Sequence, residues 1–376
     1  MIKLLKAVSI FVGTIIGAGI FGVPYIINKS GIVPGFFYFL ILGGVVLLIH
    51  LFFGEVVLRT KETCRLPGLA QKYLGAWGKI LVMISVVSGL IGTLLAYLIL
   101  SADFLKILFS PVSGLSSVQL AMIFWVAMSC LIFWGIKLIA SIELLTNIVF
   151  FLTSAVILFF IFPQFDFKNL TAFNFPNAFL PFGIILFSLA GWSAIPEIVD
   201  FLKVTRENKK IKKTIILSTA VVVPFYLIFT LVVLGAVGGA ISQNTFSSLA
   251  PLLGHKIFFL AVLAALVNLT DSILILGLHL KNTFICDLRL SNRLATAIAC
   301  GAPLLLFLIG FRNFIGTLGF VGTITGVIGG VAVILIFKKA KKMGNREPEY
   351  SLKIPSLLLY FLIAILILGA ISQFLL

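Results

Sequence analysis

The chain has 376 residues, of which 61% are hydrophobic and only 11% are charged, and its mean hydropathy is +1.23. These values exclude the water-soluble globular classes and predict an all-α polytopic membrane protein. Lys and Arg outnumber Asp and Glu by 28 to 12, an excess that would suggest nucleic-acid binding in a soluble protein. The four cysteines are widely spaced and form no CxxC pair, so no metal or redox site is expected.

Eleven hydrophobic runs are long enough to cross a bilayer, which takes about 20 residues. They lie near residues 6 to 28, 33 to 58, 79 to 108, 118 to 136, 141 to 162, 178 to 202, 213 to 239, 255 to 280, 294 to 310, 315 to 337 and 354 to 375. Lys3 and Lys6 precede the first run as in a signal peptide, but no convincing cleavage site follows, so this run is expected to be retained. Residues 1–376 are therefore expected to form a single transmembrane domain.

The positive charges predict the orientation of these spans. If the N-terminus is cytoplasmic, all but five of the 28 Lys and Arg residues fall in the inner segments. The five on the outer side are Lys29, Lys106, Lys168, Lys256 and Arg312. This bias follows the positive-inside rule and explains the net charge by topology and contact with anionic lipid, without nucleic acid. The C-terminus is then external.

The first span contains residues that break a helix. Within GTIIGAGIFGVPYI (residues 13 to 26) four glycines permit non-helical backbone, and Pro24 suits the first turn of a new helix. The helix is expected to stop near Gly17 and to restart before Pro24. In a bilayer, free backbone groups are tolerated only where protein or a polar cavity lines them, so something polar is expected to bind there.

The sixth span repeats this pattern in LFSLAGWSAIPEIVDF (residues 186 to 201). Gly19 precedes Pro24 by five residues, and Gly191 precedes Pro196 by the same interval. Matched broken helices in two halves indicate the inverted repeat of a secondary transporter. We expect one repeat at about residues 6–162, a second at about 178–337, and an accessory helix at about 354–375.

The two broken spans, together with IGTLLAYLILSADFL (residues 91 to 105), resemble the amino acid/auxin permease family within the amino acid–polyamine–organocation superfamily. The resemblance covers essentially the whole chain, although Trp192 stands where many members carry histidine. It implies a five-plus-five inverted-repeat, LeuT-like fold with broken helices 1 and 6. It also implies secondary active transport of amino acids by alternating access, driven by protons or sodium.

The breaks provide backbone groups for an amino acid zwitterion. N–H groups from Gly17 to Ile20, through Ala18 and Gly19, are expected to bind the carboxylate. Carbonyls near Thr14 and Ile15 suit an ammonium or a cation. In the sixth span the expected substrate-binding residues are Ser188, Leu189, Ala190, Gly191, Trp192 and Ser193.

Other side chains are weaker candidates. Ser88 and Gly92 could set selectivity, whereas Tyr97 and Asp103 are expected towards the outer end of span three. His50, Glu55, Glu197 and Asp200 are ionisable residues at or near membrane depth. Glu55 and Asp200 are expected to be solvated or paired with nearby cations, His50 to bond between helices, and Glu197 to pair with a cation at the inner gate.

Span eight carries the most polar cluster inside any predicted span, NLTDS (residues 268 to 272). In the fold that the resemblance implies, Asn268 and Thr270 could bind Na⁺ together with carbonyls of Gly13 and Ile16. Asp271 could instead carry a proton, or only hold helices together. A buried lysine in span five, used by some proton-driven relatives, has no counterpart, because residues 141 to 162 contain no Lys. Proton coupling is expected ahead of sodium coupling.

An enzyme is disfavoured, because the sequence contains no HExxH or GxSxG motif and no paired aspartates in facing spans. A channel is also disfavoured, because it would need charged rings or repeated carbonyl filters, whereas the breaks here form one matched pair. An amino acid sensor on the same fold, which binds without net transport, remains as the alternative.

Overall fold

The computed structural model describes residues 2–62, 65–135, 139–205, 207–239 and 241–374, and no β-strand occurs among them. Helices α1 to α7 are Ile2–Ile15, Gly19–Ser30, Ile32–Arg59, Leu66–Leu74, Ala76–Ser113, Ser117–Trp134 and Ile139–Ile161. Helices α8 to α15 are Pro181–Leu189, Ile195–Val204, Ile211–Val237, Phe246–Leu288, Asn292–Leu308, Phe314–Phe320, Val327–Met343 and Ser356–Phe374. The predicted all-α class is confirmed.

The number of spans agrees with the prediction. Nine helices of the described chain are long and apolar enough to cross a membrane, and α1 with α2 makes a tenth span when the bent pair is counted as one. The shorter apolar helix α12 occupies the place of the ninth predicted span. Predicted span eight corresponds to α11, whose two parts meet at a kink where Gly254 has φ 66°.

Local chemistry sets several helix ends. Helix α6 begins with a capping box in which Ser116 and Gln119 bond to each other's backbone N–H. The Ser291 and Asn313 side chains cap α12 and α13 in the same general way, by accepting from backbone N–H groups. Gly75 has φ 86° between α4 and α5, a conformation that favours glycine.

The first span is broken where the glycines predict it. Helix α1 ends at Ile15, α2 begins at Gly19, and the two axes differ by 53°. The Gly17 N–H turns back to the Ile15 carbonyl at 3.1 Å, so the α-helical ladder is interrupted there. Pro24 lies in the second turn of α2, not in the first as expected.

The sixth span is also broken. Helix α8 ends at Leu189, and Ala190 is extended, with φ −69° and ψ 120°. One 3₁₀ turn, Trp192–Ala194, leads into α9 at Ile195. Pro196 and Glu197 both lie in the first turn of α9, where a missing N–H and a negative charge are favourable.

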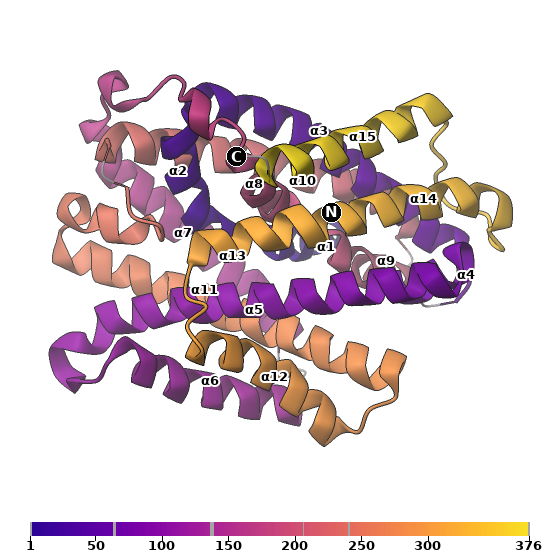
Figure 1. Cartoon of the computed structure of the whole chain (residues 1–376), viewed down its shortest axis with the longest axis horizontal. Coiled ribbons are helices and arrows are strands. Elements are labelled where there is room, and N and C mark those ends of the chain that lie inside the picture. Colours follow the sequence, from indigo (N-terminus) through magenta and orange to yellow (C-terminus); the bar gives the residue numbers. More distant parts are fainter. Residues whose placement is uncertain (1, 63–64, 136–138, 206, 240, 375–376) are drawn as a thin grey trace.

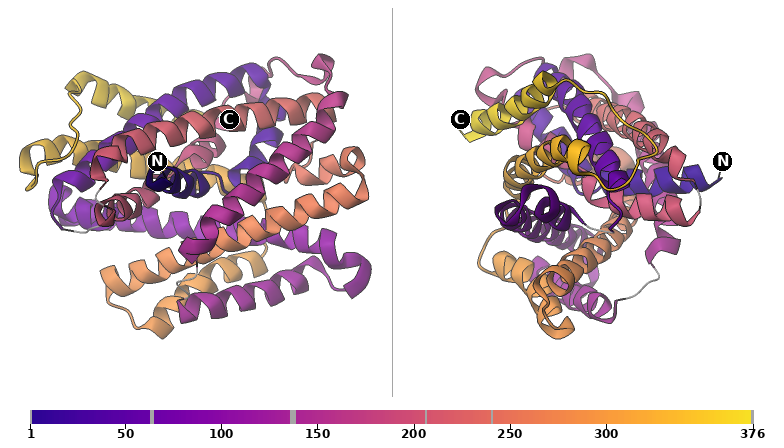
Figure 2. Two further views of the ribbon diagram at one scale, coloured as in Figure 1. Left: turned by 180° about the vertical axis from the view of Figure 1, so that it is seen from behind. Right: turned by 90° about the vertical axis from the view of Figure 1, so that its right-hand side faces the viewer.

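The helices near the breaks lie inside the molecule. In the most apolar stretch of Pro181–Val204, 67% of the residues are buried, against 17% in Ser356–Gln373 of α15. Helices α6 and α12 run together along one edge, and α15 lies along the opposite edge (Figures 1 and 2). Between α13 and α14 the helix widens into a π-helix over Val321–Gly326, which packs against α8 and α5.

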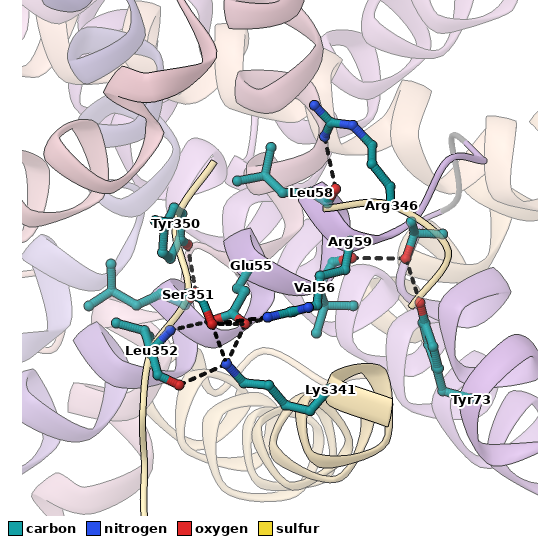
Figure 3. Close-up of polar contacts among 12 residues, drawn as sticks. Glu55, Val56, Leu58, Arg59, Tyr73, Lys341, Arg346, Tyr350, Ser351 and Leu352 are labelled. Carbon is teal, nitrogen blue, oxygen red and sulfur yellow. Dashed lines mark hydrogen bonds and ion pairs between the residues drawn. The ribbon is translucent and has the colours of Figure 1, made fainter. Parts of the chain in front are cut away.

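The segment between α14 and α15 folds onto one end of α3, and we call residues 345–352 the strap (Figure 3). The strap packs around Glu55, whose side chain is fully buried. Its carboxylate accepts hydrogen bonds from Arg59 Nε at 2.7 Å and from the Leu352 N–H at 2.7 Å, and it forms an ion pair with Lys341 Nζ at 2.5 Å. Of the two states expected for Glu55, solvated or paired, the paired one is observed.

Further contacts fix the strap along its length. Arg346 Nη1 donates to the Leu58 carbonyl at 2.8 Å, and the Tyr350 hydroxyl donates to the Leu51 carbonyl at 2.6 Å. Asn345 bonds to Glu62, whose pKa is lowered to about 2, chiefly by a hydrogen bond from Lys72. The strap thereby joins α14, α3 and the connection that leads from α3 to α4.

Candidate functional site

The two breaks face a common cavity of about 150 Å³. Thr14, Ile15 and Gly17 of the first break and Ala190, Trp192 and Ser193 of the second break line it. Three further walls come from α5, from α11 and from the π-helix with the start of α14. Residues of the two predicted motifs therefore line one cavity, and its lining is wider than these motifs.

Backbone N–H groups at the start of α2 have different partners. The Gly17 and Ile20 N–H groups bond within the break, to Ile15 and Gly17 carbonyls, so they are not both free as the sequence suggested. The Ala18 N–H donates to the Tyr97 hydroxyl at 3.3 Å. The Gly19 N–H forms no hydrogen bond with the described part of the chain. This N–H is therefore unpaired there, although Gly19 is not among the residues that line the cavity.

Two glycines allow close packing at the first break. A Cβ on Gly17 would collide with the Tyr97 hydroxyl, and one on Gly19 would collide with Ser188 Oγ. Ser188 is buried and donates to the Ile184 carbonyl at 2.7 Å. The first and second breaks are therefore in direct contact through Gly19 and Ser188, which only glycine permits at this distance.

The second break is held from behind by α3. The Gly191 N–H donates to His50 Nε2 at 3.1 Å, as expected for a histidine that bonds between helices. A Cβ on Gly191 would collide with Ile15 at the end of α1. Leu189, at the end of α8, is buried and borders a separate small space beside His50.

The remaining walls combine aromatic rings with glycines. Tyr97, Phe187 and Trp192 provide the rings. The glycines that line the cavity from α5, the π-helix and α14 are Gly89, Gly322, Gly326 and Gly329. A Cβ on Gly329 would lie 3.2 Å from the Trp192 ring, so this glycine makes room for the indole.

Tyr97 is the main residue that the sequence misplaced. It lies at the break, not towards the outer end of span three, and it is nearly fully buried. Gly89, Thr93 and Tyr97 all line the cavity and are spaced by four residues, which puts them on one face of α5. From this spacing alone, the sequence could have placed Tyr97 on the same helix face as Gly89 and Thr93. His279 of α11 and the π-helix were also missed, whereas Ser88 and Gly92 do not line the cavity.

A second, smaller cavity of about 30 Å³ lies behind the first break. Gly13, Asn147, Asn268, Asp271 and Ser272 line it together with Thr14 and Tyr97. The Thr146 hydroxyl donates to Asp271 Oδ2 at 3.0 Å, and Asn268 Oδ1 is buried without a hydrogen-bond partner among the described residues.

Two predicted cation ligands are not brought into this cavity. Thr270 donates its hydroxyl to the Leu266 carbonyl at 2.8 Å, and neither it nor Ile16 lines the cavity. Asn147 lines this cavity, although the sequence analysis gave it no role. Its Nδ2 donates to the Ser9 carbonyl at 3.2 Å, and a Cβ on Gly13 would collide with the same amide.

The cavity between the two breaks is bounded differently at its two ends. On the α2 side, Phe21 of α2 packs edge-on or tilted with Phe104 and Phe246, and the ring centroids are 5.0 to 5.4 Å apart. The Thr245 hydroxyl bonds to the Phe21 carbonyl and fixes this closure. At the opposite end the lining reaches Leu66 at the start of α4.

Next to that end lies a polar cavity of about 370 Å³ lined by Arg65, Glu197 and Asp200. Arg65 Nη2 lies 3.9 Å from Glu197 Oε1, so Glu197 has the cationic partner expected for it. Asp200 lies 3.7 Å from Lys203 Nζ and is half exposed, as expected near a helix end.

Comparison with known proteins agrees with this geometry. A sequence profile described as the tryptophan/tyrosine permease family matches residues 1–373. No curated protein matches the chain. Among solved structures, the chain is similar to "Crystal structure of MhsT in complex with L-phenylalanine", with a TM-score of 0.74 and 13% identity over 99% of this chain and 98% of that chain. At this identity the likeness concerns the fold alone, and it confirms the expected LeuT-like fold.

Proposed function

Because the chain belongs to the tryptophan/tyrosine permease family, we propose that the amino acid it transports is aromatic and is bound between the two breaks. Membership makes the protein an amino acid permease and not an enzyme. It also gives no support to the alternative of a sensor. The amino acid/auxin permease family named from the sequence is not confirmed; the findings support the coarser statement that the chain is an amino acid permease with a LeuT-like fold.

One observation carries the proposal of the site: both breaks and three aromatic side chains line one cavity. The substrate carboxylate accepts from the Gly19 N–H, with the positive end of the α2 dipole beside it. The Tyr97 hydroxyl, next to the Ala18 N–H, is a second donor for the carboxylate. The ammonium faces the carbonyl end of α1, near Thr14 and Ile15, and the carbonyl end of α8.

The wall composition supports an aromatic side chain. Trp192 and Phe187 offer ring faces and edges, which attract another aromatic ring by about 0.5–1.5 kcal/mol beyond simple burial. The glycines of the π-helix let this wall approach α8 closely, because a Cβ on Gly322 would collide with the Gly183 carbonyl and one on Gly326 would press on Leu186. The solved relative by fold was crystallised with L-phenylalanine, which fits this proposal.

For coupling we propose a proton carried by Asp271. This carboxylate borders the cavity directly behind the first break, so its protonation state can affect the carbonyl end of α1. Only one hydroxyl donor, Thr146, bonds to it within the described residues, and none of the residues that line this cavity is cationic. A sodium ion held by Asn268 with carbonyl oxygen near Gly13 is the competing outcome.

Transport into proteoliposomes tests substrate and ion together. Labelled tryptophan, tyrosine, phenylalanine and leucine would be offered with an imposed proton gradient, a sodium gradient, or neither. We expect accumulation of aromatic amino acids ahead of leucine under the proton gradient. Accumulation driven only by sodium would transfer the coupling role to Asn268, and a preference for leucine would refute the aromatic assignment.

We also propose that the N-terminus is cytoplasmic and the C-terminus external. Lys3 Nζ donates to the Thr205 carbonyl at 3.1 Å, so the start of the chain lies beside the basic segment of residues 203–213. Asn208 in that segment bonds to Glu349 of the strap at 2.9 Å. These contacts support one strongly basic side, as the positive-inside rule requires.

A further inference from the structure

His50 occupies a position behind the second break that touches three parts of the site. Its side chain is 1% exposed, and its Nε2 lies 3.1 Å from the Gly191 nitrogen. The imidazole packs edge-on against Phe11 of α1, with centroids 4.9 Å apart. It also lies beside the Trp192 ring at 6.2 Å, and Trp192 lines the substrate cavity.

The bond to Gly191 fixes which nitrogen of His50 carries the proton. A backbone N–H can only donate, so Nε2 must present its lone pair, and the neutral ring then carries its proton on Nδ1. His50 Nδ1 has no hydrogen-bond partner within the described residues. The ring borders a cavity of about 10 Å³ with Thr219 and Leu189, and a space of this size is about that of one water molecule.

The Gly191 N–H has no alternative acceptor in the helix. Helix α8 ends at Leu189, and the Ala190 N–H makes its last backbone bonds, to Leu186 and Phe187 carbonyls. The next N–H belongs to Gly191, whose φ of −141° and ψ of 9° turn the chain into the 3₁₀ segment that begins at Trp192. An acceptor on α3 is therefore what defines the direction of this turn.

We propose that His50 is a positioning residue for transport: by accepting from the Gly191 N–H, it fixes the turn that places the Trp192 indole in the substrate cavity. The inference rests on the proposed function in one respect, that this cavity holds the substrate. The position of Trp192 is independent of what is transported.

The test compares two substitutions of similar size in the full-length chain. His50→Gln keeps a strong acceptor, the Oε1 atom, near the place of Nε2, whereas His50→Met leaves only a thioether sulfur, which is a weak acceptor. With labelled L-tryptophan in proteoliposomes, we expect His50→Met to raise the apparent KM about tenfold or more, as expected for a buried donor left without a partner, and His50→Gln to remain within about threefold of wild type.

Trp125→Phe is the matched control, because it removes another buried interhelical bond, that of Trp125 Nε1 to the Cys300 carbonyl at 2.8 Å. This bond lies away from the breaks, so the KM should not change. Equal effects of glutamine and methionine at His50, or an unchanged KM in His50→Met, would show that His50 only fills space.

A second measurement does not depend on transport. In a chain whose other tryptophans, Trp77, Trp125 and Trp134, are replaced by phenylalanine, fluorescence reports on Trp192 alone. Without any substrate, the emission maximum and iodide quenching should change in His50→Met and stay as in wild type in His50→Gln. If this holds while L-tryptophan is not transported, the positioning role stands and the proposed substrate fails. Unchanged fluorescence in both variants would overturn the positioning role.

Should His50→Met not fold, the wild-type chain still gives a decisive result. Hydrogen exchange followed by mass spectrometry should find the Gly191 amide protected, although it lies in a break. Rapid exchange there would contradict the proposal.

Discussion

The single residues that matter most in this protein are glycines, which have no side chain. At Gly13, Gly17, Gly19 and Gly191 a Cβ would collide with Asn147, Tyr97, Ser188 and Ile15, respectively. Each of these contacts joins a break to another element. The glycines therefore serve both the local turn and the close approach of elements around the site, and this double demand makes them sensitive to substitution.

Gly19→Val should block substrate binding while the protein still inserts into the membrane. The added side chain would displace Ser188 and cover the unpaired N–H of the α2 start, at a cost of about 1–3 kcal/mol or more for overpacking. Binding of L-tryptophan should weaken by at least about tenfold. Gly44→Val in α3 is the control, because nothing lies within 4 Å of a Cβ there. Unchanged affinity in Gly19→Val would place the substrate elsewhere.

Asp271→Asn should separate coupling from binding. The amide keeps the size of the carboxylate and can still accept from Thr146, but it cannot take up a proton. We expect accumulation driven by a pH gradient to disappear and exchange of labelled for unlabelled substrate to continue. Undiminished proton-driven uptake by this variant would rule out Asp271 as the proton carrier.

At the scale of elements, the sequence predicts the breaks well and their neighbours poorly. Glycine and proline act on their own backbone, so the ends of α1 and α8 could be placed within a few residues. The spacing of Gly89, Thr93 and Tyr97 indicates a shared helix face, but the roles of Tyr97 and His50 depend on which helices pack against a break, and no local pattern contains that information. The strap was not predicted for the same reason, because its main partner, Glu55, belongs to a helix far away in sequence.

Glu55→Gln should destabilise the protein. It removes the buried anion of Lys341 and Arg59, which costs about 3–5 kcal/mol where both partners are fully buried. The cost is lower here, because the Lys341 and Arg59 side chains are 29% and 17% exposed. The unfolding temperature in detergent should fall by several degrees. Asp200→Asn is the control, because its ion pair with Lys203 is half exposed and should contribute little. Equal thermal shifts in the two variants would mean that the Glu55 cluster is not a stabilising contact.

At the scale of the whole molecule, the charges and the contacts give the same orientation. Nearly all of the basic residues gather on one side of the predicted spans, and Lys3, Thr205, Asn208 and Glu349 are linked on that side. In the orientation that we propose, the aromatic cluster of Phe21, Phe104 and Phe246 would face outward, and the cavity that contains Arg65 and Glu197 would face the cytoplasm.

Cysteine labelling tests this orientation. In a chain with its four native cysteines replaced, a cysteine at Lys209 should not react with an impermeant reagent in intact cells, and it should react after permeabilisation. A cysteine at Lys168, which is exposed in the connection between α7 and α8, should react in intact cells. The opposite pattern at both positions would invert the topology.

The strap also has a consequence for the order in which the chain is assembled. Glu55 enters the membrane region early in synthesis, and only Arg59 is then available as a partner. Lys341 and the Leu352 N–H are made after most of the chain. Since an incompletely paired carboxylate is unfavourable in hydrocarbon, that end of α3 must remain in contact with water during this interval. Closure of α3 against α14 is therefore a late event of biogenesis, and the first half of the chain alone cannot complete it.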